Sequence, residues 1–203
     1  ALVVETKDPP ARSVSDPKAE QVIWGPHDAF TEAWRVNVAL VRRRLKDPRL
    51  VTEILTVGTV SRTYVGMMYI DTIAPPRLVD EVRRRVQAVK VDIVNGSGIL
   101  QQYIDDSPRS LLPATLITER PDRTAAYLSE GHVALFVDTA PHAIICPATF
   151  WSLLQTAEDY YLRWPFGSTL RYIRFAALLV SLLLPSLYIG VVNYHPEMIP
   201  TEL

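Results

Sequence analysis

One turn in the sequence has residue types that could hold a phosphate group. It is Asn95-Gly96-Ser97-Gly98, placed between a predicted strand and a predicted helix. The turn lacks the third glycine of a dinucleotide-binding fingerprint and the lysine of a Walker loop, so it matches neither phosphate site. Asn, Gly and Ser more commonly form turns that cap the start of a helix. We therefore interpret residues 95–98 as a helix-capping turn and predict no cofactor.

The residues that could bind a metal or act as nucleophiles are scattered. The four histidines, which show no H-x-x-x-H or H-x-E spacing, are His27, His132, His142 and His195. The single cysteine, Cys146, stands in an apolar predicted strand, where burial disfavours the reactive thiolate. The acidic pairs Asp105-Asp106 and Glu158-Asp159 are interpreted as solvated, because neighbours on a helix do not face one site. The sequence thus predicts no catalytic residue, no metal site and no enzyme.

Two arginine runs could meet anionic lipid or an acidic partner. They are Arg42-Arg43-Arg44 and Arg83-Arg84-Arg85, and their acidic neighbours favour ordinary charged helix faces. Over the whole chain, 21 Lys and Arg balance 22 Asp and Glu, for a net charge of −1. Nucleic-acid-binding proteins usually carry a broad basic field, so we predict no nucleic-acid partner.

The elements that position these residues end in a long apolar stretch. Phe175 to Tyr194 contains no charged residue, and a helix of that length spans roughly 30 Å, the thickness of the hydrocarbon core of a bilayer. A helix in a small soluble core normally keeps a polar stripe, which this stretch lacks. The sequence therefore predicts a membrane-spanning helix in contact with the lipid bilayer, and Pro185 in its middle predicts a kink or a helix contact.

The flanks of the predicted span differ in charge. Arg163, Arg171 and Arg174 precede it, whereas Glu197 and Glu202 follow it. By the positive-inside rule, the N-terminal side is expected in the cytosol.

The rest of the chain alternates between helix and strand patterns. We expect a helix after Gly25-Pro26, with Phe30 and Trp34 on its apolar face, and another opened by Pro75-Pro76. Further helices are expected at 97–104, from Pro121 to Gly131 and at 150–162. Short strands are expected at 1–4, 51–57, 63–70, 91–94, 133–137 and 143–146. This order predicts an α/β fold, a mixed sheet flanked by helices and followed by one transmembrane helix.

Several short motifs follow one another along nearly the whole chain. They are Gly25-Pro26 with Phe30, Asn37-Val38-Ala39-Leu40-Val41-Arg42-Arg43-Arg44, Thr118-Glu119-Arg120-Pro121-Asp122, Glu158-Asp159-Tyr160-Tyr161, Leu184-Pro185-Ser186 and His195-Pro196-Glu197. In this order they resemble the A subunits of GerA-type spore germinant receptors and the related spore protein SpoVAF. In one place the pattern differs: His27-Asp28-Ala29 stands where the family usually has Arg-Glu-Gly.

The resemblance implies a function and a set of partners. It implies a spore germination protein, a receptor subunit in the spore inner membrane with a cytosolic N-terminal domain, which couples nutrient sensing to ion release. The implied partners are a transporter-like B subunit, a lipoprotein C subunit and further copies of the chain. It also implies a division into residues 1–24, a remnant strand and linker of a preceding subdomain, residues 25–165, a cytosolic α/β subdomain, and residues 168–203, the first transmembrane helix and following loop.

Two other functions are compatible with the sequence. One is a membrane-anchored interaction scaffold of the SpoVAF type. The other is an anchored enzyme with a pocket at strand ends near Asp71 or residues 95–98. The sequence leaves open which nutrient is sensed, which ion is released, and whether this domain binds a ligand itself.

Overall fold

The computed structural model describes residues 14, 16–22, 24–106, 110 and 113–194. These residues fall into two compact units, one ending at Thr149 and the other beginning at Phe150. The strand expected at 1–4 and the motif residues His195, Pro196 and Glu197 lie outside the described residues.

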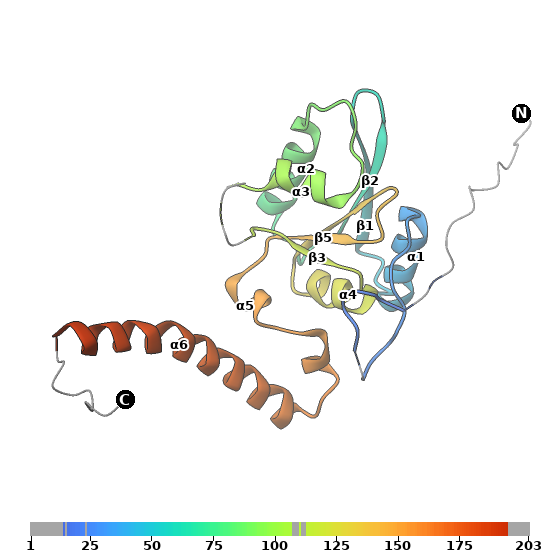
Figure 1. Ribbon diagram of the computed structural model, residues 1–203. Helices are drawn as coiled ribbons and strands as arrows, with labels where there is room; N and C mark the ends of the chain where they lie inside the picture. Colours follow the sequence, from blue (N-terminus) through green and yellow to red (C-terminus); the bar gives the residue numbers. More distant parts are fainter. Residues whose placement is uncertain (1–13, 15, 23, 107–109, 111–112, 195–203) are drawn as a thin grey trace, which may run out of the picture. The chain divides into compact units, whose positions relative to one another are not determined.

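The first unit is built on a five-stranded sheet (Figure 1). The strands are β1 (Leu50–Val57), β2 (Thr63–Ile70), β3 (Leu116–Thr118), β4 (Val133–Val137) and β5 (Ala143–Cys146), in the order β1-β2-β4-β5-β3. The expected α/β class, a sheet flanked by helices with one long apolar helix after it, is confirmed. Every strand pair is antiparallel rather than mixed. Short connections account for the β1–β2 and β4–β5 pairs, because only antiparallel neighbours can be joined by a tight turn.

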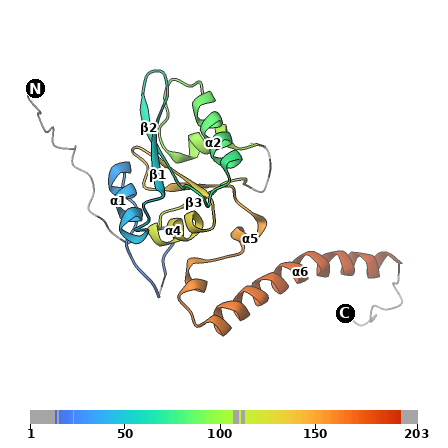
Figure 2. The ribbon, with the colours of Figure 1, turned by 180° about the vertical axis from the view of Figure 1, so that it is seen from behind.

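Helices cover both faces of this sheet. Figures 1 and 2 show α2 (Pro76–Ala88) and α3 (Ser97–Ile104) on one face, and α1 (Trp34–Arg44) and α4 (Pro121–Ser129) on the other. Successive side chains of a strand point to opposite faces. Met67 of β2 therefore packs in the α2–α3 core, and Met68 packs in the α1–α4 core. This is why strands such as β4 are apolar at every position.

Some boundaries differ from the expectation. The first helix begins at Trp34 rather than just after Pro26, and Phe30 lies before it, edge-on to Phe136 with 5.2 Å between ring centroids. The prediction of a strand at 91–94 is wrong. Carbonyl groups of this segment accept hydrogen bonds from the turn after β1, with 2.9 Å between Thr59 N and Val91 O. The short β3 was not expected.

The second unit contains α5 (Phe150–Leu153), the 3-10 helix η1 (Ala157–Tyr160) and α6 (Trp164–Tyr194). The single helix expected over residues 150–162 is therefore wrong, because the chain turns between α5 and η1. By length and composition, α6 could cross a membrane, and none of its most apolar stretch is buried. It includes the predicted span, Phe175 to Tyr194, with Pro185 inside the helix.

Candidate functional site

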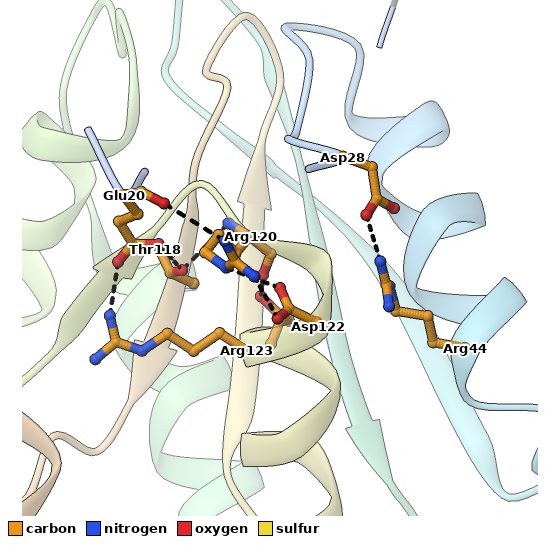
Figure 3. Close-up of polar contacts among 8 residues, drawn as sticks. Glu20, Asp28, Arg44, Thr118, Arg120, Asp122 and Arg123 are labelled. Atoms are coloured by element: carbon orange, nitrogen blue, oxygen red, sulfur yellow. Dashed lines mark hydrogen bonds and ion pairs between the residues drawn. The ribbon is translucent and has the colours of Figure 1, made fainter. Parts of the chain in front are cut away.

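The motif residues of the first unit gather where the chain enters the α1–α4 face of the sheet. We call this group the junction; Figure 3 shows seven of its members, drawn from segments far apart in the sequence. Its residues are Glu20, Asp28, Phe30, Thr31, Asn37, Arg43, Arg44, Thr118, Glu119, Arg120, Asp122 and Arg123.

The segment after β3 holds the incoming chain at residues 18–20. The carboxylate of Glu119 accepts hydrogen bonds from the backbone N–H groups of Lys18 and Ala19, at 2.9 and 3.2 Å. The carboxylate of Glu20 accepts hydrogen bonds from the Thr118 hydroxyl and from the Arg123 guanidinium, both at 2.6 Å (Figure 3). These contacts join residues about a hundred positions apart, so they fix where the upstream chain meets the domain.

Arg120 is a buried charge at the centre of the junction. Its side chain is 0% exposed, and that of Asp122 is 8% exposed. The pair is bidentate, with Nε to Oδ1 at 3.0 Å and Nη2 to Oδ2 at 2.7 Å. Two parallel hydrogen bonds offset the desolvation of a buried guanidinium, which a single contact would not do well. Pro121 begins α4 between them, and its fixed φ suits the first turn of a helix.

Asn37 joins the extended segment before α1 to the helix. Its buried side chain accepts a hydrogen bond from Thr31 N at 2.8 Å and donates one to Thr31 O at 2.6 Å. Next to it, Phe30 N donates to Glu119 O at 2.8 Å. Gly25, with φ of +132°, and Pro26 lie upstream of this segment. The family motifs on α1 and after β3 thus hold the same stretch of chain from two sides.

The first arginine run is divided between two partners. Arg43 and Arg44 both bind Asp28, whereas Arg42 donates to Leu50 O at 3.2 Å and to Thr52 Oγ1 at 2.9 Å. Sequence reasoning missed Asp28 as a partner, since 15 residues separate it from Arg43 and no local spacing links them. Only the opposite charge was available as a signal.

The second run, Arg83-Arg84-Arg85, contacts carboxylates of α2 and its neighbours, as a charged helix face would. Arg85 pairs with Glu81 at 2.6 Å, as the i, i+4 spacing suggests. Arg83 reaches across to Glu53 of β1 at 2.8 Å. Hydrogen bonds from Arg83, opposed by burial and aided by Tyr69, lower the pKa of Glu53.

The second unit has a polar centre of its own. Asp159, expected to be solvated, has a side chain only 1% exposed and accepts a hydrogen bond from Arg174 at 3.0 Å. Arg171 lies 3.6 Å from the same carboxylate. Burial alone would raise the pKa of Asp159, but hydrogen bonds from Arg174 and Thr156 bring it below the ordinary aspartate value. No residue spacing predicts this contact, because η1 and α6 meet only after the chain has turned back.

A cavity of about 320 Å³ lies in the first unit between α2, the end of α3 and the end of β5. Arg85, Asp106, Thr115 and Cys146 are among its lining residues. Burial raises the pKa of the Cys146 thiol to about 12, so the group is a core thiol at neutral pH. Burial also raises the pKa of Asp105, against a hydrogen bond from Thr115.

Among the other candidates, one histidine contacts the junction. The turn at 95–98 leads into α3, with Gly96 at φ of +106° just before the helix begins. His142 lies 3.2 Å from Glu119, and His132 contacts Tyr127 O. In the part of the chain that the structure describes, no three His, Cys, Asp or Glu side chains are placed to share a metal ion. The junction supplies attachment between segments through charge-assisted hydrogen bonds.

Comparison with known proteins gives a match over the full length. The family model described as Bacillus/Clostridium GerA spore germination protein matches residues 1–203. Spore germination protein B1 of Bacillus subtilis is 40% identical over 202 residues, which are 100% of this chain and 42% of that protein. Stage V sporulation protein AF of the same organism is 35% identical over 205 residues, covering 100% of this chain and 41% of that protein.

One solved structure is also similar. It is the crystal structure of the N-terminal domain of the A subunit of the Bacillus megaterium spore germinant receptor GerK3, at 40% identity and a TM-score of 0.49. The match covers 60% of this chain and 97% of that one. The chain spans about two fifths of the length of the curated relatives described above.

Proposed function

Because the chain belongs to the GerA family of spore germination proteins, we propose that it is the head and first membrane-spanning helix of a germinant-receptor A subunit. In this role it couples nutrient sensing to ion release across the spore inner membrane. The observation that carries the proposal is the family match over residues 1–203 together with a long helix whose most apolar stretch is not buried.

The arrangement of the first unit supports a signalling role. The junction holds the upstream chain through Glu119, Glu20 and the buried Arg120–Asp122 pair, so a displacement of that chain acts directly on α4 and β3. We propose that these motif residues serve attachment and transmission, and that the first unit lies in the cytosol. Binding of B-type and C-type subunits, and assembly with further copies of the chain, belong to the same proposal.

The first experiment asks whether the gene product senses a nutrient. Spores that lack the gene are compared with wild-type spores for the fall in optical density and the release of ions after different nutrients are added. A receptor subunit predicts a response lost for one class of nutrient and kept for others. An equal slowing with every nutrient would instead support the scaffold role of a SpoVAF-like protein.

The second experiment tests coupling between the two units. A four-residue Gly-Ser insertion between Thr149 and Phe150, where the units divide, is made at the native locus. We expect normal accumulation of the protein but a weakened germination response, because a flexible linker transmits little force. The same insertion after Val60, in the exposed turn between β1 and β2, is the matched control. Equal responses from both insertions would contradict coupling through this boundary.

A further inference from the structure

The second unit turns back on itself just before the apolar helix. The contacts between α5, η1 and α6 connect residues 151–159 with residues 167–175. Trp151 packs against Phe175 with the rings tilted by 40° and 5.6 Å between their centroids, and Arg174 donates a hydrogen bond to Leu154 O. Asp159 closes the fold by accepting the Arg174 hydrogen bond at 3.0 Å. We call residues 150–160 the foot.

The close approach of the foot depends on a glycine. A Cβ added at Gly167 would lie 2.6 Å from the backbone carbonyl oxygen of Asp159. The first turn of α6 can therefore touch η1 only without a side chain at this position. The foot is thus held to α6 by packing, by an ion pair and by backbone contact.

This fold changes the order of residues along the axis of α6. Trp164, the first residue of α6, lies about 16 Å along the helix axis from Phe175, at about 1.5 Å per residue. Trp151 precedes Trp164 in the sequence, yet it lies beside Phe175, the first residue of the uncharged run. If α6 crosses a bilayer, Trp151 is at the edge of the hydrocarbon core and Trp164 is farther out.

The exposed side chains of this region have the chemistry of a membrane interface. Trp and Tyr are enriched where headgroups meet acyl chains, since their rings are apolar with one polar atom. Phe150 and Trp151 of the foot are both exposed, with Trp151 at 60%. Tyr172 and Tyr194 are exposed on α6 and are separated by about 33 Å of helix, close to the thickness of the hydrocarbon core.

The charges of the foot are compatible with this location. Its buried carboxylate, Asp159, is met by Arg174 and Arg171, so the group does not enter a region of low dielectric unpaired. Residues 150–174 contain three cationic and two acidic side chains, so their net charge is +1. They are Arg163, Arg171 and Arg174, and Glu158 and Asp159. Attraction to anionic lipid is therefore small, and the aromatic side chains are the main source of affinity.

We propose that the foot is an interfacial element that returns to the membrane surface, with Trp151 seated among the lipid headgroups at the edge of the hydrocarbon core, deeper than Trp164. The ligand surface is a lipid bilayer. This inference rests on the proposed function only in requiring that α6 crosses that bilayer.

Fluorescence quenching tests the order of depths. The full chain is reconstituted in phosphatidylcholine vesicles as two variants that keep the buried Trp34 and either Trp151 or Trp164, with the other tryptophans changed to Phe. A lipid with a quencher near the top of its acyl chains should quench Trp151 at least about twofold more than Trp164. Iodide in the buffer should show the reverse order. A third variant with Trp34 alone gives the background.

The inference is overturned if Trp164 lies deeper in the bilayer than Trp151. That order is expected when the chain runs toward the membrane without turning back. Shielding of Trp151 from both quenchers also overturns it, because a protein surface would then cover the foot. We further expect 0.5 M salt, at which charges are screened beyond about 4 to 5 Å, to leave the lipid quenching of Trp151 unchanged. A salt-dependent signal would contradict aromatic anchoring.

Two further measurements keep the outcomes separate. Asp159→Asn removes the charge of the carboxylate that accepts the Arg174 hydrogen bond, and it should reduce lipid quenching of Trp151. Glu158→Gln makes the same charge change one residue away and should leave the quenching unchanged.

Extraction with alkaline carbonate tests the membrane span itself. Release of the protein by carbonate would overturn the span and this inference together. Resistance to carbonate with Trp151 quenched only by iodide would overturn this inference alone.

Discussion

The guanidinium of Arg120 is fully buried, and the carboxylate that compensates it lies only two residues away. The pair spans the start of α4, where Asp122 stands in the first turn and is also favoured by the helix dipole. A short motif therefore builds a complete buried ion pair from local sequence. The contacts of Glu20 with Thr118 and Arg123 lie around this ion pair, so a loss of the pair affects the whole junction.

Removing one member of the Arg120–Asp122 pair should destabilise the fold. We expect Arg120→Met to lower the free energy of unfolding by about 3–5 kcal/mol, because the buried carboxylate of Asp122 then loses its bidentate contact with the guanidinium. The double change with Asp122→Asn should recover part of that loss. Urea unfolding followed by tryptophan fluorescence measures both. Arg123→Met, on the same helix and with partly exposed Glu20 as its partner, should cost about 1 kcal/mol. Equal losses from Arg120→Met and Arg123→Met would contradict a special role for the buried charge.

The single cysteine provides a measurement of folding without any substitution. Cys146 is 5% exposed in β5, and burial raises the pKa of its thiol to about 12. At pH 8 the folded chain should therefore react slowly with iodoacetamide, because the thiolate is scarce and covered. In urea the pKa returns toward its ordinary value and labelling should be complete. Mass spectrometry after timed labelling measures this. Rapid labelling under native conditions would contradict a closed core around β5.

Elements fixed by their own pattern were predictable from the sequence. Helix α2 begins at a proline pair and carries a regular apolar stripe, so its position follows from local residues alone. Strands β2 and β4 are apolar on both faces, which indicates a covered sheet. The segment before α1 was misjudged because Phe30 continues the helical spacing. A side-chain contact with Asn37 holds Thr31 outside the helix, and a hydrogen bond to the distant Glu119 holds Phe30 there.

The candidate sites were predictable only in part, for the same reason. Family motifs identified Asn37, Glu119 and Arg120, and the structure brings all three to the junction. Glu20, which binds Thr118 and Arg123, and Asp28, which binds Arg43 and Arg44, were not predictable, because no spacing encodes contacts between separate segments. Asp159 was misjudged because exposure cannot be read from a pair of acidic residues when the chain turns back over them.

Helix α6 contains two glycines in different surroundings, which allows a matched test of the foot. A Cβ at Gly167 would meet Asp159 O at 2.6 Å, whereas a Cβ at Gly190 would meet nothing within 4 Å. Gly167→Ala should loosen the foot by about 1–2 kcal/mol, which raises its open population roughly 5- to 30-fold. Tryptic cleavage after Arg163 in detergent should accelerate accordingly, since proteolysis follows the open population. Gly190→Ala should leave the rate unchanged. Equal rates for the two variants would contradict close packing of η1 on α6.

The two units imply a division of tasks across the whole chain. The first unit encloses its core on both faces of the sheet, whereas the most apolar stretch of α6 is not buried. A helix of this kind is stable in lipid, where its backbone groups are satisfied internally. By the positive-inside rule, we expect the flank that carries the arginines to lie on the cytosolic side.

Orientation can be measured with the folded chain because its native thiol is buried. Val60→Cys places a thiol in the exposed turn between β1 and β2, where the side chain is 72% exposed. Thr201→Cys places one beyond α6 in the sequence. In intact cells, a membrane-impermeant maleimide should label the second variant and not the first, since Arg163, Arg171 and Arg174 keep the first unit inside. Inside-out vesicles should reverse the pattern. Labelling of Val60→Cys in intact cells would place the first unit outside, and a cytosolic head would then be excluded.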